Sequence, residues 1–308
     1  MGISIVIPLY NKEKHIANTL ERVFQQSYSD FEVVIVNDGS TDNSVSIVES
    51  FSDSRIKLIS QKNQGAASAR NKGVSLAKHN HVAFLDADDE WGKDYLFRMN
   101  QLIERYPEAV LYGTNYYIIE NGQRSILTYP GVKQSEGIID NYFLSKEYTP
   151  LWTSAVVVKK AIFNQLGGFP TKCKVCEDID LWCRFALNGD IAYINEPLAN
   201  YRRDSTNMLS KSTDTTYYFP FLDEYKKCIS NDDERYSSVQ DYVCYKQLFS
   251  VSFCLRNRNK KEAKQILKRM TNPGIFKTRK MAYALLALMP QRMIDFVFAV
   301  SKEIRGKK

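Results

Sequence analysis

His81-Val82-Ala83-Phe84-Leu85-Asp86-Ala87-Asp88-Asp89-Glu90 is the stretch that decides the fold. Its first five residues form an apolar run typical of a buried parallel strand, and the run ends abruptly in acid. Ligands of open α/β sheets bind outside the carboxyl ends of the strands. Asp86 and Asp88 are therefore placed to hold a hard divalent cation, which in turn can hold nucleotide phosphates. The alternative is an acidic helix start, because Asp caps helices and stabilises their first turn.

The first 110 residues alternate short β-type runs with helix-type segments. The predicted strands cover residues 3–8, 31–36, 56–60 and 82–85. The predicted helices cover residues 12–26, 42–51, 66–77 and 93–106. This alternation predicts an α/β fold, with a doubly wound, mostly parallel sheet, right-handed crossovers and helices on both faces.

The pattern changes after residue 110. Residues 112–119 and 125–129 flank Asn121-Gly122, which is a strong hairpin signal. A helix is expected over residues 178–187, and the chain beyond about Thr213 looks helical to its end. We therefore expect one α/β domain over residues 1–212, with a nucleotide-binding half (1–110) and an acceptor half (111–212), and a helical extension over residues 213–308.

Composition is that of an ordinary soluble protein, with 44% apolar and 25% charged residues among 308. Six cysteines in a chain of this length do not indicate a disulfide scaffold, so we expect free thiols and a cytoplasmic location. Cys173 and Cys176 have the spacing of half a zinc site, but no second pair follows at a usable spacing.

Charge is concentrated in the last 54 residues. Residues 255–308 contain fifteen Lys and Arg against three Asp and Glu, so their net charge is +12. Because the net charge of the whole chain is +7, residues 1–254 are net negative. A basic tail on an acidic body favours an anionic surface over nucleic acid as a partner.

The same tail holds two apolar stretches, 281–289 and 293–300, separated by Pro290. Neither reaches the roughly 20 residues that span a bilayer. Two short amphipathic helices at the inner face of the plasma membrane fit this pattern, with their basic side chains on anionic head groups. The alternative is a helical pair packed on the main domain or at the seam of a homodimer.

Polar residues also follow the first three predicted strands. The first strand ends in Pro8-Leu9-Tyr10-Asn11, and the second is followed by Asn37-Asp38-Gly39-Ser40-Thr41-Asp42, where Asp38 is expected to be available to a base or a ribose. After the third strand, Gly65 and four small residues precede Arg70, which we expect to contact a diphosphate or a base. An ordinary capped turn and a tightly packed helix are the alternatives. Dehydrogenase and phosphate-loop glycine motifs do not occur.

In combination, these strand ends resemble the family of inverting glycosyltransferases called family 2, which has the A-type (GT-A) fold of nucleotide-diphospho-sugar transferases. The resemblance covers about residues 3–207. Its motifs in this chain are Ile5-Val6-Ile7-Pro8-Leu9-Tyr10-Asn11, Val36-Asn37-Asp38-Gly39-Ser40-Thr41-Asp42, Gly65 with Ala69-Arg70-Asn71, Phe84-Leu85-Asp86-Ala87-Asp88-Asp89 (the DXD motif), and Gly167-Gly168-Phe169 followed by Glu177-Asp178-x-Asp180-Leu181-Trp182.

The resemblance implies a role for each matching position. The nucleotide sugar, with UDP slightly favoured as its nucleotide, would contact Pro8, Tyr10, Asn11, Glu13, Asp38, Gly65, Arg70, Asp86 and Ala87. Asp88 would coordinate Mg²⁺ or Mn²⁺. Asp204 stands where the family often has a His, so it is either a further oxygen ligand of the metal or a solvated loop charge.

Glu177 and Asp178 supply the base that sugar transfer with inversion needs. In the resemblance Asp178 is that base, and a helix N-terminus should keep its carboxylate ionised. The alternative is that both residues only complement the helix dipole.

The sequence thus favours an inverting hexosyl- or N-acetylhexosaminyltransferase of cell-surface polysaccharide synthesis, acting on a glycan or lipid-linked acceptor. That acceptor should lie near Trp152, Thr153 and residues 170–210. Rival interpretations are a sugar nucleotidyltransferase and a membrane-associated protein that binds a nucleotide sugar without transferring it. The nucleotidyltransferase would need a Gly-rich basic loop after the first strand, which this chain lacks.

Overall fold

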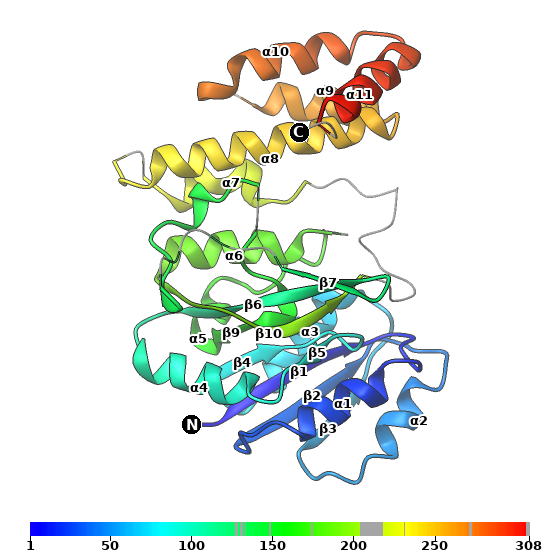
Figure 1. Cartoon of the computed structure of the whole chain (residues 1–308), viewed down its shortest axis with the longest axis vertical. Coiled ribbons are helices and arrows are strands. Elements are labelled where there is room, and N and C mark those ends of the chain that lie inside the picture. The colour runs from blue at the N-terminus through cyan, green and yellow to red at the C-terminus, as the bar shows by residue number, and fades with distance from the viewer. Residues whose placement is uncertain are drawn as a thin grey trace. The chain divides into compact units, whose positions relative to one another are not determined.

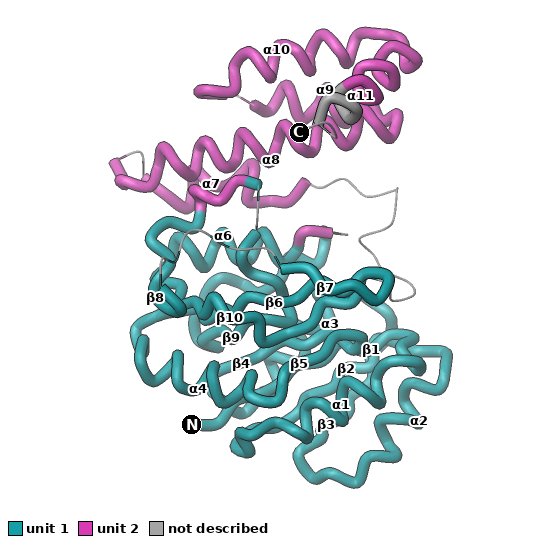
Figure 2. Tube along the Cα trace, viewed as in Figure 1, with its two compact units in different colours: residues 1–142, 147–172, 177–208 teal, residues 143–146, 173–176, 209–308 magenta. Residues whose placement is uncertain are grey.

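The structure is a computed structural model that describes residues 1–126, 129, 132, 134–147, 149–173, 175–203, 218–230, 232–270 and 273–305. The chain divides into two compact units (Figures 1 and 2). Unit 1 comprises residues 1–142, 147–172 and 177–208, and unit 2 comprises residues 143–146, 173–176 and 209–308. The expected domain boundary at residue 212 falls within residues 204–217, which lie outside the described ranges.

Unit 1 begins with four parallel strands whose order in the sheet is β3-β2-β1-β4. The strands are β1 (Ile3–Leu9), β2 (Phe31–Asn37), β3 (Ile56–Ser60) and β4 (His81–Phe84). The helices that connect and follow them are α1 (Ile16–Phe24), α2 (Ser44–Glu49), α3 (Ala66–Leu76) and α4 (Tyr95–Arg105). These elements confirm the predicted α/β alternation.

The strand order reverses between β1 and β4, and this reversal places the helices on both faces. On one face, apolar residues from α1, α2 and α4 join alternate residues of β1 in one core. On the other face, α3 approaches β1 so closely that a Cβ on Gly73 would lie 2.3 Å from a Val6 methyl. The point between β1 and β4 is a topological switch point, where open α/β sheets bind ligands.

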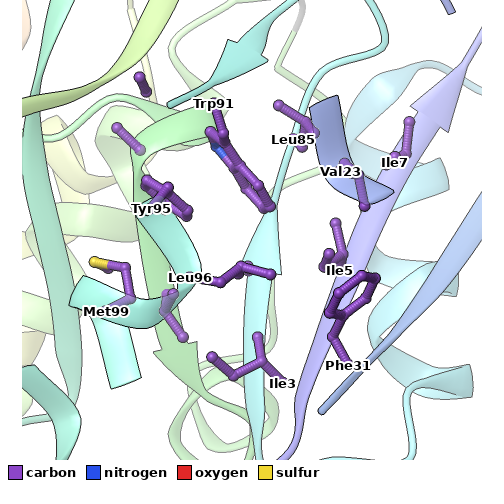
Figure 3. Packing of buried hydrophobic residues seen from close by; sticks show 14 of the residues in the cluster. Ile3, Ile5, Ile7, Val23, Phe31, Leu85, Trp91, Tyr95, Leu96 and Met99 are labelled. Carbon is purple, nitrogen blue, oxygen red and sulfur yellow. The ribbon is translucent and has the colours of Figure 1, made fainter. Parts of the chain in front are cut away.

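Figure 3 shows the first of these cores, in which Ile3, Ile5 and Ile7 of β1 point the same way toward the helices. Trp91 and Tyr95 stack with ring centroids 4.2 Å apart and an interplanar angle of 15°. Burying aromatic and aliphatic side chains of this size stabilises a fold by about 1.5–3 kcal/mol each. This packing holds α4 against the sheet directly after the acidic loop.

Beyond β4 the sheet continues as β9-β6-β10-β5 and is mixed rather than parallel throughout. The remaining elements of unit 1 are β5 (Glu90–Trp91), β6 (Leu111–Glu120), β7 (Gln123–Ile126), β8 (Glu136–Ile138), β9 (Val156–Lys159), β10 (Ile191–Arg202), α5 (Lys160–Gln165) and α6 (Glu177–Asn188). Strand β9 runs antiparallel to both of its neighbours. The hairpin prediction is confirmed, since Glu120 pairs with Gln123 around Asn121 and Gly122, which both have positive φ.

The first predicted helix begins four residues later than expected, at Ile16 instead of Lys12. Residues 11–13 instead form a turn that is hydrogen-bonded to the turn after β2. The amphipathic pattern of α1 extends back to residue 12, but the backbone amides of residues 11–13 donate to side chains that follow β2. The sequence pattern therefore predicted a helix start that is too early.

From residue 218 onward the described part of unit 2 is mainly helical, as predicted. Its helices are α7 (Phe221–Cys228), α8 (Tyr236–Arg256), α9 (Lys260–Arg269), α10 (Lys277–Leu286) and α11 (Gln291–Arg305). Leu248, Val251 and Leu255 of α8 form a core with Ile266 of α9 and Ile294 of α11. None of the helices in the described residues is both long enough and apolar enough to cross a bilayer.

Candidate active site

The turn after β1 is tied to the turn after β2 by a ladder of hydrogen bonds. Asn11, which has a φ of 50°, accepts at its Oδ1 from the backbone N–H of Thr41 at 2.8 Å. The amide of Lys12 donates to Ser44 Oγ at 2.8 Å, and Glu13 Oε2 accepts from the amide of Asn43 at 3.0 Å. The two strand ends therefore form one fixed edge of the site, and Asn11 and Glu13 build that edge.

Asp38 follows β2 and is buried, and it faces the turn after β3. Its Oδ1 accepts from Gln61 Nε2 at 2.8 Å and from the amide of Gln64 at 2.9 Å, and its Oδ2 accepts from the amide of Gly65 at 2.8 Å. These three contacts hold Asp38 against the turn after β3, and its availability to a base or a ribose stays a prediction. Three protein donors already occupy its oxygens, because they satisfy a carboxylate that is out of water.

The acidic loop after β4 is held from α1 and from the turn after β1. Thr19 Oγ1 lies 3.0 Å from the carbonyl oxygen of Ala87 and 3.1 Å from that of Asp89. The carboxylate of Asp88 accepts from Lys12 Nζ at 2.6 Å, and both side chains are about 15% exposed (15% and 14%). The side chain of Asp86 is 27% exposed. The loop thus keeps both carboxylates of the Asp-x-Asp motif at the switch point.

Asp89 lies behind these two carboxylates and is buried. Its Oδ2 accepts from Ser154 Oγ at 2.7 Å, and Ser154 Oγ in turn accepts from the amide of Asp86 at 3.0 Å. Burial, together with the neighbouring charges of Asp88 and Asp86, raises the pKa of Asp89 well above its ordinary value. Asp89 therefore anchors the loop to residues 153–155 and is not exposed to a ligand.

Arg70 on α3 joins the acidic loop to the start of α6. Its guanidinium donates to Asp86 Oδ1 at 2.6 Å and to Glu177 Oε1 at 2.9 Å, and its side chain is 6% exposed. Although burial alone would lower it, the charges of Asp86 and Glu177 raise the pKa of Arg70 further. Two of its nitrogens contact carboxylates, while Nε is buried without a hydrogen-bond partner among the described residues, and the expected contact with a diphosphate or a base stays a prediction. The small residues Ala67 and Ala69 are buried, as a tightly packed helix requires.

Asp178 is the second residue of α6 and adjoins Thr153. Its Oδ1 accepts from the amide of Ile179 at 2.8 Å, and its Oδ2 accepts from Thr153 Oγ1 at 3.3 Å. Burial and the charge of Glu177 raise the pKa of Asp178 to about 6, against lowering by the Ile179 amide and by Arg70. Desolvation therefore brings the pKa of this carboxyl closer to neutrality, although the group is still mostly ionised at pH 7.

Three aromatic rings gather next to this carboxylate. Trp152 lies 5.0 Å from Tyr116 and 4.8 Å from Tyr201, measured between ring centroids. Each of the three side chains is partly exposed, and Asp178 is one of the charges that raise the pKa of Tyr116. Flat, partly exposed rings beside a carboxylate offer a surface on which a sugar ring can stack.

Carboxylate oxygens are the type of ligand that a hard divalent cation prefers. The carboxylates of Asp86, Asp88, Glu177 and Asp178 face two cationic side chains, Arg70 and Lys12, so the cluster is short of positive charge. Lys12 already places a cation 2.6 Å from Asp88 Oδ2. Among the described residues no group of three or more acidic, His or Cys side chains has metal-site geometry. The other predicted ligand, Asp204, lies outside the described residues.

Most of the predicted site residues are brought to one edge of the sheet. Pro8 lies near the end of β1, Tyr10 follows that strand and is 47% exposed, and Gly65 precedes α3 with a φ of 87°. Sequence reasoning missed the roles of Lys12, Asp89 and Ser154. A buried third Asp after the motif was a signal for Asp89, but Lys12 lies 76 residues from its partner and carries no local signal.

Comparison with known proteins agrees with this geometry. The family model described as glycosyl transferase family 2 matches residues 4–165. One relative is the Escherichia coli protein WfgD, a UDP-Glc:alpha-D-GlcNAc-diphosphoundecaprenol beta-1,3-glucosyltransferase. It is 38% identical over 201 residues, which are 63% of this chain and 73% of the relative.

Two solved structures share the fold over nearly the whole chain. S. aureus TarS 1-349 in complex with UDP-GlcNAc aligns with a TM-score of 0.71 at 17% identity, over 98% of this chain and 92% of that one. The mannosyltransferase PcManGT from Pyrobaculum calidifontis, in complex with GDP-Man and Mn2+, aligns with a TM-score of 0.60 at 18% identity, over 99% and 88% of the two chains. These likenesses confirm the predicted GT-A fold.

Proposed function

This chain belongs to glycosyl transferase family 2, and from that premise we propose that it transfers a sugar, with inversion, from a nucleotide-diphosphate sugar to a hydroxyl of a glycan or lipid-linked acceptor. One observation carries the proposal. Arg70 pairs with Asp86 of the acidic loop after β4 and with Glu177 at the start of α6. The carboxylates proposed to hold a metal and the Asp178 carboxyl, whose pKa is raised, therefore share one site. This is the division of labour that metal-assisted transfer requires.

The donor side of the site is the switch point between β1 and β4. Tyr10, which is exposed at the end of β1, has an apolar ring available to a base, and the fixed backbone around Asn11 and Glu13 shapes the edge beside it. The Asp38 contacts hold the turn that carries Gly65 and thereby orient the N-terminus of α3. UDP-GlcNAc bound to TarS and UDP-Glc in the name of WfgD support a UDP-sugar as the donor.

Asp88 and Asp86 would hold the divalent cation, in keeping with the Mn2+ in the PcManGT complex. When bound, that cation neutralises charge on the diphosphate. Arg70 keeps Asp86 in place and balances part of the acidic cluster through its two ion pairs. No protonated acid is needed for a leaving group whose charge is already compensated.

Asp178 is the proposed base. A pKa of about 6 leaves its carboxylate about nine-tenths ionised at pH 7, yet basic enough to take a hydroxyl proton as the acceptor attacks the anomeric carbon. Thr153 and the amide of Ile179 fix its two oxygens. Attack from the side opposite to the departing diphosphate inverts the configuration at that carbon.

The acceptor side is proposed to be the aromatic surface of Tyr116, Trp152 and Tyr201. A sugar ring that stacks on these partly exposed rings would lie next to Asp178, with its hydroxyl edge toward the base. The name of WfgD places a diphosphoundecaprenol-linked sugar as the acceptor of that relative. A lipid-linked glycan is the corresponding proposal for this chain, with a hexose or an N-acetylhexosamine as the transferred sugar.

Unit 2 supplies a surface suited to membrane attachment. Large apolar side chains stand exposed on α10 and α11: Met281, Leu285, Met293, Phe296, Val297 and Val300. On α11 their spacing repeats every three and four residues, which is one helix face. Exposed Lys277 and Arg292 lie on the same helices. We propose that these faces rest on an anionic membrane, with residues 1–212 as the catalytic domain and residues 213–308 as its attachment; a seam between two copies is the competing use.

Donor binding and transfer are tested together. Nucleotide sugars are screened by their protection against thermal unfolding, with and without Mn²⁺, because a ligand that binds only the folded state raises its stability. The donor selected in this way is then incubated with a lipid-linked sugar acceptor, and the product is followed by mass spectrometry. Protection without any product would favour a non-catalytic binding protein, and release of diphosphate from a sugar phosphate and a nucleoside triphosphate would favour the nucleotidyltransferase.

A further inference from the structure

Asp86, Asp88 and Asp89 of the acidic loop each contact a different side chain, and these contacts differ in how easily they can be exchanged. Asp86 is paired with Arg70, which also holds Glu177 and is almost fully buried. Asp89 is held by Ser154 and the backbone of Arg202 inside the protein. The partner of Asp88 is the ammonium of Lys12, a point charge on a flexible four-carbon stem, so this contact is the most easily exchanged.

The backbone of Lys12 is fixed while its side chain spans the switch point. Its amide donates to Ser44 Oγ at 2.8 Å, and its carbonyl accepts from the amides of His15 and Ile16 at 2.9 and 3.0 Å. From this fixed base the ammonium reaches Asp88 Oδ2 at 2.6 Å. The stem can therefore swing the charge by several ångströms without any change in the fold.

We propose that Lys12 is a displaceable counterion: without nucleotide it competes with a divalent cation for the carboxylate of Asp88, and with nucleotide bound it moves to the diphosphate. This inference rests on the proposed function and deepens it. A carboxylate oxygen in direct contact with an ammonium has one lone pair engaged, and the positive charge of the ammonium repels a second cation. Once a cation takes that oxygen, the released ammonium stands beside the phosphates that the cation holds.

The proposal makes two predictions of opposite sign for Lys12→Gln. Mn²⁺ alone should bind about tenfold more tightly, because a charge-assisted contact of this kind no longer has to be broken. UDP in the presence of saturating Mn²⁺ should bind about tenfold more weakly, because a contact to the diphosphate is lost. A residue that merely supports the structure would, when replaced, weaken both.

The test is a titration of the full-length wild type, Lys12→Gln and Lys14→Gln. Free Mn²⁺ is measured by electron paramagnetic resonance, UDP binding is measured by calorimetry, and circular dichroism confirms that each variant is folded. Lys14 is exposed and two residues away, so Lys14→Gln removes the same charge without the contact and should match the wild type. This control distinguishes the effect of losing the contact with Asp88 from the effect of losing one positive charge.

The outcomes are distinguishable. Tighter Mn²⁺ and weaker UDP in Lys12→Gln alone support the proposal. Mn²⁺ affinity in Lys12→Gln that equals that of the wild type, or no Mn²⁺ binding by any of the three proteins, overturns it. Failure of the wild type to bind UDP at all would instead contradict the proposed function. The competition between Lys12 and the cation is still tested in that case, because Mn²⁺ binding is measured without UDP.

Discussion

The guanidinium of Arg70 lies 2.9 Å from Glu177, a residue 107 positions further along the chain. This ion pair connects α3, which follows the third parallel strand, to α6, which begins with Glu177 and Asp178. Because the same guanidinium also contacts Asp86, one side chain spaces the donor-side carboxylate from the proposed base. The local charge that Asp178 experiences is therefore set by the state of this pair.

Replacing Glu177 by Gln should shift the pH profile of the transferase toward acid. Activity of the wild type is expected to fall as the pH drops through about 6, where Asp178 gains a proton. The charge of Glu177 raises the pKa of Asp178, and the charge of Arg70 lowers it. Glu177→Gln removes the negative charge and keeps the positive one, so the pKa of Asp178 should fall. The acidic midpoint of kcat/KM, which reports the free enzyme, should move down, and an unmoved or raised midpoint would contradict this assignment.

Asp178→Asn should bind the donor normally and turn over more slowly. A positioned base is worth about 10²–10⁴ in rate, and Asn cannot accept the proton. Donor affinity from calorimetry and kcat from product formation separate the two effects. The configuration of the product, read by NMR from the wild type, must be inverted; a retained configuration would exclude single displacement whatever the variant does.

Asp88→Asn should keep the fold and lose cation-dependent nucleotide binding. The change removes a charge from the cluster that faces the donor, while the backbone of the loop stays held by Thr19. UDP affinity is measured with and without Mn²⁺. Asp94→Asn, an exposed acid a few residues away, is the matched control. The assignment is wrong if Asp88→Asn retains the Mn²⁺ dependence of the wild type.

Ser154→Ala should weaken both the fold and the site. Its hydroxyl satisfies Asp89 Oδ2 and the amide of Asp86, and both would be left unpaired in a buried position. A loss of about 1–3 kcal/mol in the free energy of unfolding is expected from denaturant titration. Donor affinity should fall as well, because the acidic loop loses its anchor. Unchanged stability would show that another group satisfies Asp89.

The double variant Leu285→Glu with Phe296→Glu should lose affinity for anionic vesicles. These side chains are 60% and 68% exposed, so the replacements should cost little in folding while they put charge on the proposed membrane face. Phe249→Glu, on α8 of the same unit and 47% exposed, serves as the control. Co-sedimentation at low salt measures the binding. Vesicle binding that survives in the double variant would remove support for this face, and sedimentation equilibrium tests the competing dimer seam.

Much of the fold is written in local patterns. The four strands of residues 3–85 are short, mostly apolar runs, and the Asn-Gly turn of residues 121–122 matches the twist of its hairpin, so each needs only near neighbours to be recognised. The abrupt acid after His81–Phe84 marked the binding edge for the same reason. The sequence by itself therefore determined the α/β alternation, the hairpin and the edge at which the site lies.

Only the tertiary structure decided which residues far apart in the sequence become hydrogen-bond or ion-pair partners. Whether Asp38 faces a ligand or the turn at Gly65, and whether Asp88 meets water or Lys12, depends on which strand ends lie side by side. Asp38 meets Gly65 because β2 lies beside β3, and Asp88 meets Lys12 because the strand order reverses between β1 and β4. Neither neighbourhood can be read from the spacing of residues. The pKa of Asp178 is likewise a property of burial, which outweighs the helix N-terminus only after α6 has docked against Thr153.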